Sequence, residues 1–490
     1  MTKPAEPKTS RNTVLALTAI LTLALALRVY KLDAALWYDE IATLLRYVRL
    51  PFGELFSSYD SLNNHMFFSL QAKASVAMFG ETAWALRLPA MLFGLASVWA
   101  LWWLAKDLFS RNIALFSALL MAVSYHHIWF SQNARGYTGL LFFGLVATAL
   151  LVRAVQKPSW SVWLLYMACL VAAMYTHLSA AFLFLAQGLA WLIYTFGLRA
   201  QGAKLAKGWW TMPLGAAFVA LVAMLVLYAP VLGQMTETFG GVQQGTGSEL
   251  KAASIAEWKN PLWTLMEIAT SLGPLLAPLF PVIFLVILIS MLNFRGPAIL
   301  VPMIFVAHVA LTVVILKATS FRIWPRYFFV DIGFICLFLV HGSYVIAGWA
   351  QRKWQALPAF LGALLATGGI VASLALLPAN YRYAKQDFAG ARDLIEASRT
   401  PGAPVFALGL TAMPYVEYLA PDWLDIQTLA DFETVYEPGK EAWIVYSFIP
   451  VIERRFADLF DTYADQFEEV RYIHGTLSGG GMIIMKSVSP

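Results

Sequence analysis

Long apolar segments alternate with short polar loops over residues 13–380 of the chain. A helix that crosses a bilayer needs roughly 20 apolar residues, so this pattern predicts about eleven transmembrane helices. The predicted spans are residues 14–27, 84–105, 112–126, 137–153, 160–178, 180–197, 211–232, 272–293, 297–316, 327–349 and 356–378. The chain is therefore expected to be a polytopic α-helical membrane protein.

One apolar segment, residues 66–79, does not fit this series because it is short and carries Lys73 near its centre. We interpret it as an interfacial or re-entrant helix, since a full span here would invert every later loop. The first span follows three basic residues, Lys3, Lys8 and Arg11, and no clear cleavage site comes after it. These features are typical of an uncleaved signal anchor with a cytoplasmic N-terminus.

Most basic residues of the loops lie on the side predicted to be cytoplasmic, as the positive-inside rule requires. They are Lys106, Arg111, Arg153, Lys157, Arg199, Lys204, Lys207, Arg295, Arg352 and Lys353. The formal net charge is +5, but the cations are scattered and form no continuous patch, so we expect no nucleic-acid partner. Both cysteines, Cys169 and Cys336, lie in apolar spans, which argues against a disulfide framework or a cysteine metal site.

The composition changes after the last predicted span. Short apolar runs at 404–409, 443–449, 468–473 and 482–486 predict strands, and charged segments at 387–398 and 450–466 predict helices. Strands that alternate with amphipathic helices indicate a small α/β layer. We therefore divide the chain into a transmembrane domain, residues 1–379, and an extracytoplasmic α/β domain, residues 380–490.

Two adjacent carboxylates, Asp39 and Glu40, follow the first span in the predicted outer-face loop 29–83. Charge near a bilayer is costly and marks function where it persists, and the preceding Trp37 and Tyr38 suit a membrane interface. We therefore expect the two acids to be catalytic at the water boundary. The alternative is that they cap a juxtamembrane helix through its dipole.

Cations also occur on the predicted outer side, where the positive-inside rule does not expect them. They are Arg135, Lys317, Arg322 and Arg326. The planar fork of an arginine matches phosphate oxygens, so these residues predict an anion-binding site. They could instead bind lipid headgroups or pair with Asp39, Glu40 or Asp331. We expect Asp331 itself to hold Arg326 or Arg322 in place.

The order of several short motifs resembles that of the GT-C superfamily of membrane glycosyltransferases. They are Asp39-Glu40, Asn63-Asn64-His65, Phe79-Gly80-Glu81 with Arg87-Leu88-Pro89-Ala90, Ser131-Gln132-Asn133-Ala134-Arg135-Gly136-Tyr137, Tyr175-Thr176-His177 and Pro325-Arg326-Tyr327. The resemblance covers roughly residues 13–380 and is to the bacterial relatives of protein O-mannosyltransferases and lipid A aminoarabinose transferases. No single motif is specific, whereas their order and placement together are.

This resemblance implies transfer of a hexosyl or pentosyl group, with inversion, from a polyprenyl-phosphate donor. The acceptor would be a glycan, a lipid or a protein at the outer face of a bacterial inner membrane. In this interpretation Asp39 is the general base, and Glu40 orients groups or binds a sugar hydroxyl or a metal ion. The substrate-binding residues would be Asn64, His65, Arg135, Tyr137, Lys317, Arg322 and Arg326.

The chain contains no Asp-x-Asp triplet, the usual metal-binding signature of nucleotide-sugar transferases. We therefore predict no metal site and no cofactor. A divalent cation could still bind to Asp39, Glu40 and His65, although their spacing matches no recognised site. Two other functions fit an outer-face anion site: a polysaccharide ligase or polymerase that uses undecaprenyl-diphosphate-linked glycan, and a transporter or flippase of lipid-linked sugars. The lack of an internal repeat argues against the transporter.

Overall fold

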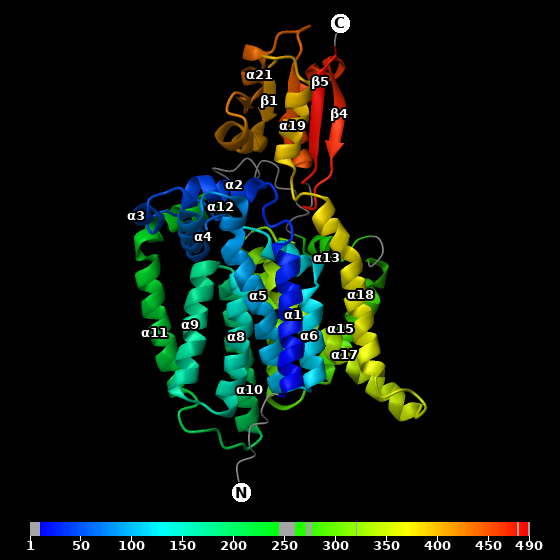
Figure 1. Cartoon of the computed structure of the whole chain (residues 1–490). Helices are drawn as coiled ribbons and strands as arrows, with labels where there is room; N and C mark the ends of the chain where they lie inside the picture. Colours follow the sequence, from blue (N-terminus) through cyan, green and yellow to red (C-terminus); the bar gives the residue numbers. More distant parts are fainter. Residues whose placement is uncertain are drawn as a thin grey trace.

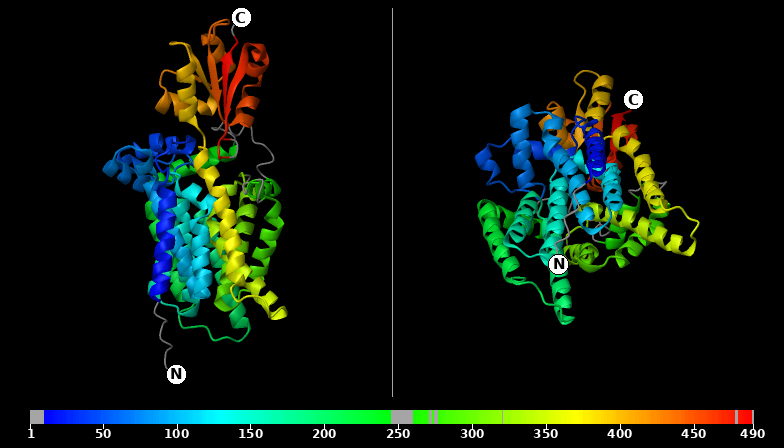
Figure 2. Two further views of the ribbon diagram at one scale, coloured as in Figure 1. Left: turned by 45° about the vertical axis from the view of Figure 1, so that its right-hand side comes forward. Right: turned by 60° about the horizontal axis from the view of Figure 1, so that its bottom comes forward.

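The computed structural model describes residues 10–244, 260–270, 273, 277–319, 321–477 and 480–488. A bundle of long helices carries a small α/β domain at one end, and its first helix, α1, begins at the other end (Figure 1). Figure 2 shows the same arrangement from two further sides. Short helices lie between the bundle and the α/β domain, and three of the residues expected in the site, Asp39, Glu40 and Arg326, lie in short helices.

Among the described residues, eight helical segments are long and apolar enough to cross a bilayer. They are built on α1 (Arg11–Val29), α5 (Ala83–Leu108), α8 (Tyr137–Gln156), α10 (Ala180–Ala200), α11 (Thr211–Tyr228), α16 (Leu300–Ala318), α17 (Ile332–Lys353) and α18 (Leu361–Arg382). Large apolar side chains such as Phe218 and Leu225 point outward from α11 and are more than half exposed, as a surface in contact with lipid requires.

The three other predicted spans also coincide with helices. The helices α6 (Arg111–Ala122) and α7 (Tyr125–Ser131) form one span bent by 60°, which raises the count to nine among the described residues. The helices α9 (Trp160–Thr176) and α15 (Phe280–Leu292) are apolar but shorter. The expected number of about eleven therefore depends on the bent pair and on these two shorter helices.

The bend between α6 and α7 is stabilised by a fully buried arginine, Arg28, near the end of α1. Its guanidinium donates to the carbonyl oxygens of Ala122 at 3.0 Å and Met121 at 3.5 Å, and lies 2.5 Å from Nδ1 of His127. The last carbonyls of a helix lack partners and form the negative end of its dipole, so a cation there is stabilising. The bend directs the chain after α7 across the end of the bundle.

Residues 66–79 form the helix α4 (Met66–Phe79), which has 14 residues. At 1.5 Å per residue this helix is about 21 Å long, too short for a hydrocarbon core of about 30 Å. Lys73 near its middle donates to the carbonyl oxygen of Val48 at 3.1 Å and lies over the ring of Phe52. The other short helices at this end of the bundle include α2 (Tyr38–Thr43), η1 (Leu44–Val48), α3 (Phe52–Leu55), α12 (Leu232–Gln244) and α13 (Pro261–Thr270).

The α/β domain contains a five-stranded sheet in the order β2-β1-β3-β5-β4. The strands are β1 (Val405–Leu408), β2 (Leu424–Ile426), β3 (Trp443–Tyr446), β4 (Phe467–Ile473) and β5 (Met482–Ser487). The first three strands in this order are parallel, and β5 is antiparallel to both of its neighbours. The helices are α19 (Phe388–Ser398), α20 (Ala412–Pro414), α21 (Leu429–Val435), α22 (Ile449–Arg455) and α23 (Ala457–Thr462). The expected α/β domain is confirmed, and β2 was not predicted.

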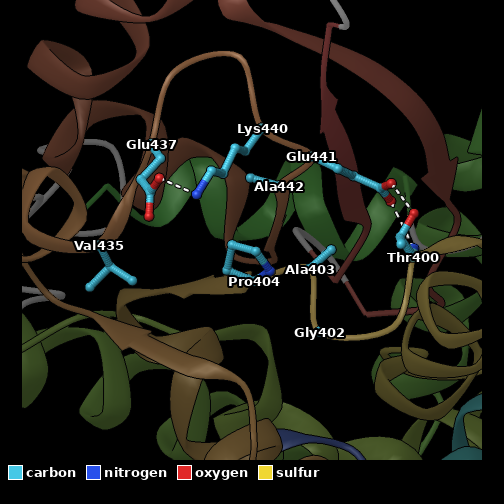
Figure 3. A pocket seen from close by; sticks show the side chains of 9 residues that line it. All are labelled: Thr400, Gly402, Ala403, Pro404, Val435, Glu437, Lys440, Glu441 and Ala442. Carbon is cyan, nitrogen blue, oxygen red and sulfur yellow. Dashed lines mark hydrogen bonds and ion pairs between the residues drawn. The ribbon is translucent and has the colours of Figure 1, made fainter.

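The parallel strands point toward the helical bundle. The chain that leaves β1 forms α20, which contacts α2 of the bundle, and the residue Phe448 that follows β3 contacts Tyr38. A hollow of about 360 Å³ lies at the opposite, amino ends of β1 and β3. In this hollow Lys440 pairs with Glu437, and Glu441 accepts a hydrogen bond from Thr400 (Figure 3). The carboxyl ends of the strands therefore face the expected site.

Candidate active site

The site lies at the end of the bundle beneath the α/β domain. Asp39 is the second residue of α2, and its side chain is 16% exposed. Its Oδ2 lies 3.6 Å from the guanidinium of Arg326, which belongs to the 3-10 helix η7 (Pro325–Asp331). The structure therefore brings together two residues that are far apart in the sequence: a carboxylate that reaches solvent, and a cation.

Glu40 is in a different environment because its side chain is fully buried. Both of its oxygens accept hydrogen bonds from Arg87 at 2.8 and 2.6 Å, and Oε1 also accepts from the amide of Ala134 at 2.7 Å. Burial alone would raise the pKa of Glu40, but the charge and hydrogen bonds of Arg87 hold this pKa below its ordinary value. This burial leaves Glu40 no surface on which to bind a sugar hydroxyl or a metal ion, the role expected from the sequence.

Arg87 is a residue whose role was not predicted from the sequence. It lies in the first turns of α5, is 2% exposed, and donates to the carbonyl oxygens of Leu32, Ala34 and Ala35 as well as to Glu40. A guanidinium at the start of an apolar span needs a buried anion, which is the signal that could have identified the pair. The pair fixes α2 against α5.

The segment 132–136 connects this pair to the second arginine of the site. Arg135 is 3% exposed, and its guanidinium donates to the carbonyl oxygen of Asn63 at 2.8 Å and to Oγ1 of Thr43 at 3.3 Å. Its Nε has no partner among the described residues. All of these partners are neutral, so Arg135 is a buried cation that bonds to α2 through Thr43 and has no carboxylate partner among the described residues.

His65 lies directly beside Arg135. Its Nδ1 accepts a hydrogen bond from the amide of Gly136 at 2.7 Å, so a neutral imidazole must carry its hydrogen on Nε2. That Nε2 lies 3.1 Å from a terminal nitrogen of Arg135, which is also a donor. Both donors lack an acceptor among the described residues, and one acceptor atom placed beside the two nitrogens could lie within hydrogen-bond distance of each. An anionic oxygen would satisfy both.

Two more rings complete this corner of the site. The ring of His177 lies 4.3 Å from that of His65 and 4.9 Å from that of Tyr137, measured between centroids. Burial lowers the pKa of both histidines, and the nearby charges of Arg135 and Arg326 lower it further, to about 3 for His177. Both histidines are therefore neutral at physiological pH. The charges of both arginines therefore act on the same two rings.

The other predicted cations lie near Trp324 or at the end of α16. The guanidinium groups of Arg326 and Arg322 lie 5.3 and 5.9 Å from the ring centroid of Trp324. Lys317 is exposed in the last turn of α16, and no described side chain forms a hydrogen bond or ion pair with it. The structure therefore pairs Arg326 with Asp39, bonds Arg135 to Thr43 of the same helix, places Arg322 beside Arg326, and leaves Lys317 exposed at the end of α16.

Two expectations about polar neighbours need correction. Asp331 pairs with His308 at 2.9 Å, and both side chains are buried. The expectation that Asp331 holds Arg326 or Arg322 is therefore wrong, and the carboxylate that contacts Arg326 is Asp39. Asn64 is 4% exposed, donates to the carbonyl oxygen of Ser58 and accepts from Ser69. The side chain of Asn64 therefore points into the protein and holds the loop before α4, whereas the sequence predicted that it binds substrate.

No group of three or more histidine, cysteine, aspartate or glutamate side chains in the described part of the chain could hold a metal ion. The side chains of Asp39, Glu40 and His65 do not converge on one point. Glu40 accepts a hydrogen bond from Arg87, and His65 accepts one from the amide of Gly136. The chemistry that the site offers is therefore that of a carboxylate, two guanidinium groups and two neutral imidazoles.

An apolar groove of about 460 Å³ lies between α4, α9 and α11. Its lining includes Phe67, two residues after His65 in the sequence, and Tyr175, two residues before His177. The other lining residues, such as Leu70, Met167 and Val219, are all apolar. A groove of this kind between transmembrane helices suits a hydrocarbon chain whose polar head lies at the histidine pair.

Comparison with known proteins gives the architecture a family context. A family model for dolichyl-phosphate-mannose-protein mannosyltransferase matches residues 66–232. The crystal structure of ArnT from Cupriavidus metallidurans in the apo state has a TM-score of 0.53 to this chain at 16% identity, and the match covers 97% of this chain and 98% of ArnT. This chain has the GT-C fold. The resemblance inferred from the order of motifs is thereby confirmed.

Two ligand-bound structures with the GT-C fold are also similar. ArnT from Cupriavidus metallidurans bound to undecaprenyl phosphate has a TM-score of 0.52 at 15% identity, over 97% of this chain and 98% of that one. The archaeal oligosaccharyltransferase AglB from Archaeoglobus fulgidus, in complex with an inhibitory peptide and a dolichol-phosphate, has a TM-score of 0.50 at 11% identity. The match covers 98% of this chain and 74% of AglB. No curated protein sequence matches the chain.

Proposed function

We propose that the chain is a glycosyltransferase that moves a sugar from a polyprenyl-phosphate donor to an acceptor at the outer face of a bacterial inner membrane. The observation that carries this proposal is the corner formed by Arg135 and His65. A buried cation with only neutral partners lacks the counter-charge that burial normally demands, and a neutral imidazole N–H faces it. A phosphate oxygen would supply both the charge and the missing acceptor.

The groove between α4, α9 and α11 supports a lipid-linked donor over a free phosphate. Its lining is largely apolar and includes the neighbouring rings of Phe67 and Tyr175, which lie two residues from His65 and His177 in the sequence. A polyprenyl chain in this groove would leave its phosphate between Arg135 and Arg326. The family model and the bound undecaprenyl phosphate and dolichol-phosphate of the similar structures agree with a donor of this class.

Asp39 is the group that we assign to the acceptor. In the proposed reaction its carboxylate takes the proton of the acceptor hydroxyl while the hydroxyl oxygen forms a bond to the anomeric carbon. The bond from that carbon to the phosphate oxygen breaks, and the polyprenyl phosphate leaves with the electron pair. Attack from the side opposite the phosphate inverts the anomeric carbon. Arg135 and Arg326 stabilise the charge that develops on the phosphate, which lowers the barrier.

The reaction can be tested by mass spectrometry of lipid-linked sugars in a strain that lacks the gene. We expect a polyprenyl-monophosphate sugar to accumulate, and the purified protein should consume that lipid when an acceptor fraction is added. Accumulation of a long glycan on undecaprenyl diphosphate would instead identify a ligase or polymerase. The same spectra would give the nature of the sugar, hexose or pentose. The acceptor fraction that supports consumption of the lipid would show whether the acceptor is a glycan, a lipid or a protein.

A double-mutant cycle can test whether Arg135 and Arg326 bind one phosphate. Lysine keeps the charge but not the planar fork, so Arg135→Lys and Arg326→Lys should each weaken donor binding and slow transfer. If both residues bind one phosphate, the free-energy effect of the double substitution should differ from the sum of the two single effects by about 0.5–3 kcal/mol. The measurement is the KM for the donor and kcat in the single and double variants.

The matched control for this cycle is Arg49→Lys, which changes a half-exposed outer-face arginine paired with Glu81. This control should keep wild-type kinetics, because exposed ion pairs contribute less than about 1 kcal/mol. Additive effects, with donor binding unaltered in both single variants, would show that Arg135 and Arg326 only anchor the protein at lipid headgroups.

The proposed side of the active site makes a separate prediction. In a Cys169→Ala, Cys336→Ala background, a cysteine at Lys440 in the α/β domain should react with an impermeant maleimide on intact spheroplasts. A cysteine at Lys204, in the exposed loop between α10 and α11, should react only after permeabilisation. Labelling of Lys204→Cys but not of Lys440→Cys would reverse the orientation and move the site to the cytoplasm.

A further inference from the structure

We propose that the α/β domain positions the catalytic carboxylate, and that Phe448 is the residue through which it does so. This inference rests on the proposed function, because it assigns Asp39 the role of general base. Phe448 follows β3, and its ring meets the ring of Tyr38, the residue before Asp39, edge to face at 5.1 Å. Through this contact the α/β domain fixes the orientation of α2.

The contact lies where a sheet of this topology normally binds a ligand. In the sheet order β2-β1-β3-β5-β4, the strands β1 and β3 are parallel neighbours. The chain after β1 leads to β2 on one side, and the chain after β3 leads to β4 on the other side. Open α/β sheets bind ligands in the crevice that forms at the carboxyl ends of such strands. Here Tyr38 packs against a cluster that includes residues of β1 and β3 and the helix α20. The crevice is therefore occupied by the helix that carries Asp39.

The backbone of Phe448 shows that its ring is held there against a local preference. Its φ is +56°, in the left-handed region where bulky side chains are rarely found and where glycine fits without strain. The preceding Ser447 is fixed by three hydrogen bonds: its amide donates to Thr411, its hydroxyl donates to the carbonyl oxygen of Gly481, and it accepts from Gln386. Strain that the surroundings maintain at one residue is typical of functional positions.

A second attachment holds the α/β domain independently of Phe448. Lys385, in the linker after α18, donates from Nζ to the carbonyl oxygen of Gln132 at 2.7 Å and lies 5.0 Å from the ring of Trp129. The indole of Trp129 in turn donates to Oγ1 of Thr476 at 3.0 Å. A change at Phe448 should therefore leave the α/β domain attached while it releases α2.

The test uses three variants of Phe448 in the purified full-length protein. Phe448→Ala and Phe448→Gly both remove the ring, but glycine also relieves the left-handed backbone, so the glycine variant should unfold at the higher temperature of the two. Displacement of a reacting group by about 1 Å can cost about 10²-fold in rate. We expect kcat to fall by about 10- to 100-fold equally in the alanine and glycine variants, with the donor KM within about twofold of wild type. Phe448→Tyr keeps the ring and should therefore keep the wild-type kcat.

The control is Phe460→Ala, which removes a ring of the same domain that contacts Tyr446 and not α2. It should leave kcat unchanged. If kcat follows the unfolding temperature, so that the glycine variant outperforms the alanine variant, Phe448 has only a local structural role and the proposal is overturned.

Hydrogen exchange gives a readout that does not depend on which reaction the protein catalyses. Amides of residues 38–48 should exchange faster in the alanine and glycine variants than in wild type and Phe460→Ala, because α2 loses its contact with the α/β domain. Unchanged exchange in this segment would overturn the proposal. Faster exchange together with a wild-type protein that transfers no sugar would instead remove the proposed function and leave the contact with α2 established.

Discussion

Replacement of Asp39 by asparagine is expected to lower kcat for sugar transfer by about 10²–10⁴-fold, the usual contribution of a general base. Asparagine has nearly the same shape and can still accept a hydrogen bond from Arg326, but it cannot take up the proton of the acceptor hydroxyl. The loss should appear at saturating donor, since the missing step is the chemistry.

Donor binding should survive this substitution. The carboxylate of Asp39 lies 3.6 Å from Arg326, where it competes for a guanidinium that we assign to the donor phosphate. Removing its negative charge should leave the donor KM unchanged or lower it. The measurement is a titration of polyprenyl-phosphate sugar with the purified variant, followed by product formation under saturation.

The control for Asp39→Asn is Glu54→Gln, which neutralises an exposed carboxylate of α3 on the same side of the bundle. It should behave as wild type. If Asp39→Asn keeps a rate within about tenfold of wild type, a different group takes the proton. An equal loss in both variants would indicate a dependence on the general charge at this end of the bundle.

Features that depend on local periodicity could be predicted from the sequence. Each apolar segment of the expected length coincides with a helix, because burial of a backbone in lipid leaves few alternatives to the helix. The number of predicted spans between Asp39, Arg135 and Arg326 puts all three residues on the same side of the membrane, so the sequence predicts that they lie at one end of the bundle. The strand β2 was missed because it has only three residues, one of them Asp425, and shows no apolar run.

The choice of partners among charged residues could not be predicted in the same way. Arg326 pairs with Asp39 across more than half of the chain, whereas the nearer Asp331 pairs with His308. Sequence distance favoured Asp331 as the partner of Arg326, but Asp331 is the residue immediately before α17 and lies in the bundle interior, where His308 of α16 reaches it. Only the packing of α16 against α17 decides between these carboxylates.

The segment 132–136 explains why so many of the predicted residues meet. Its consecutive residues contact different parts of the chain: Gln132 accepts from Lys385, Asn133 from Trp37, and the amide of Ala134 donates to Glu40. The next two, Arg135 and Gly136, both contact His65. A disturbance of α2, of α4 or of the linker to the α/β domain should therefore reach the phosphate site through this one segment.

The buried pair of Glu40 and Arg87 carries the largest expected effect on stability. Removal of one partner leaves an uncompensated charge in the interior, so Glu40→Ala or Arg87→Met should each lower the free energy of unfolding by about 3–5 kcal/mol. The double variant Glu40→Leu, Arg87→Met removes both charges and should be more stable than either single variant. Arg49→Met, which breaks an exposed pair with Glu81, should cost less than about 1 kcal/mol and serves as the control.

The double variant also separates the two roles that Glu40 could have. Apolar residues can replace the charges, but the amide of Ala134 then loses the acceptor that fixes it beside Arg135. We therefore expect the double variant to regain stability and still to bind the donor more weakly, with a raised KM, because Arg135 is less well held. Denaturant unfolding and donor titration of the same preparations measure both quantities. If Glu40→Ala instead kept wild-type stability and donor KM but lost turnover, Glu40 would belong to the chemistry, as the sequence first indicated, and its burial would have to open during the reaction.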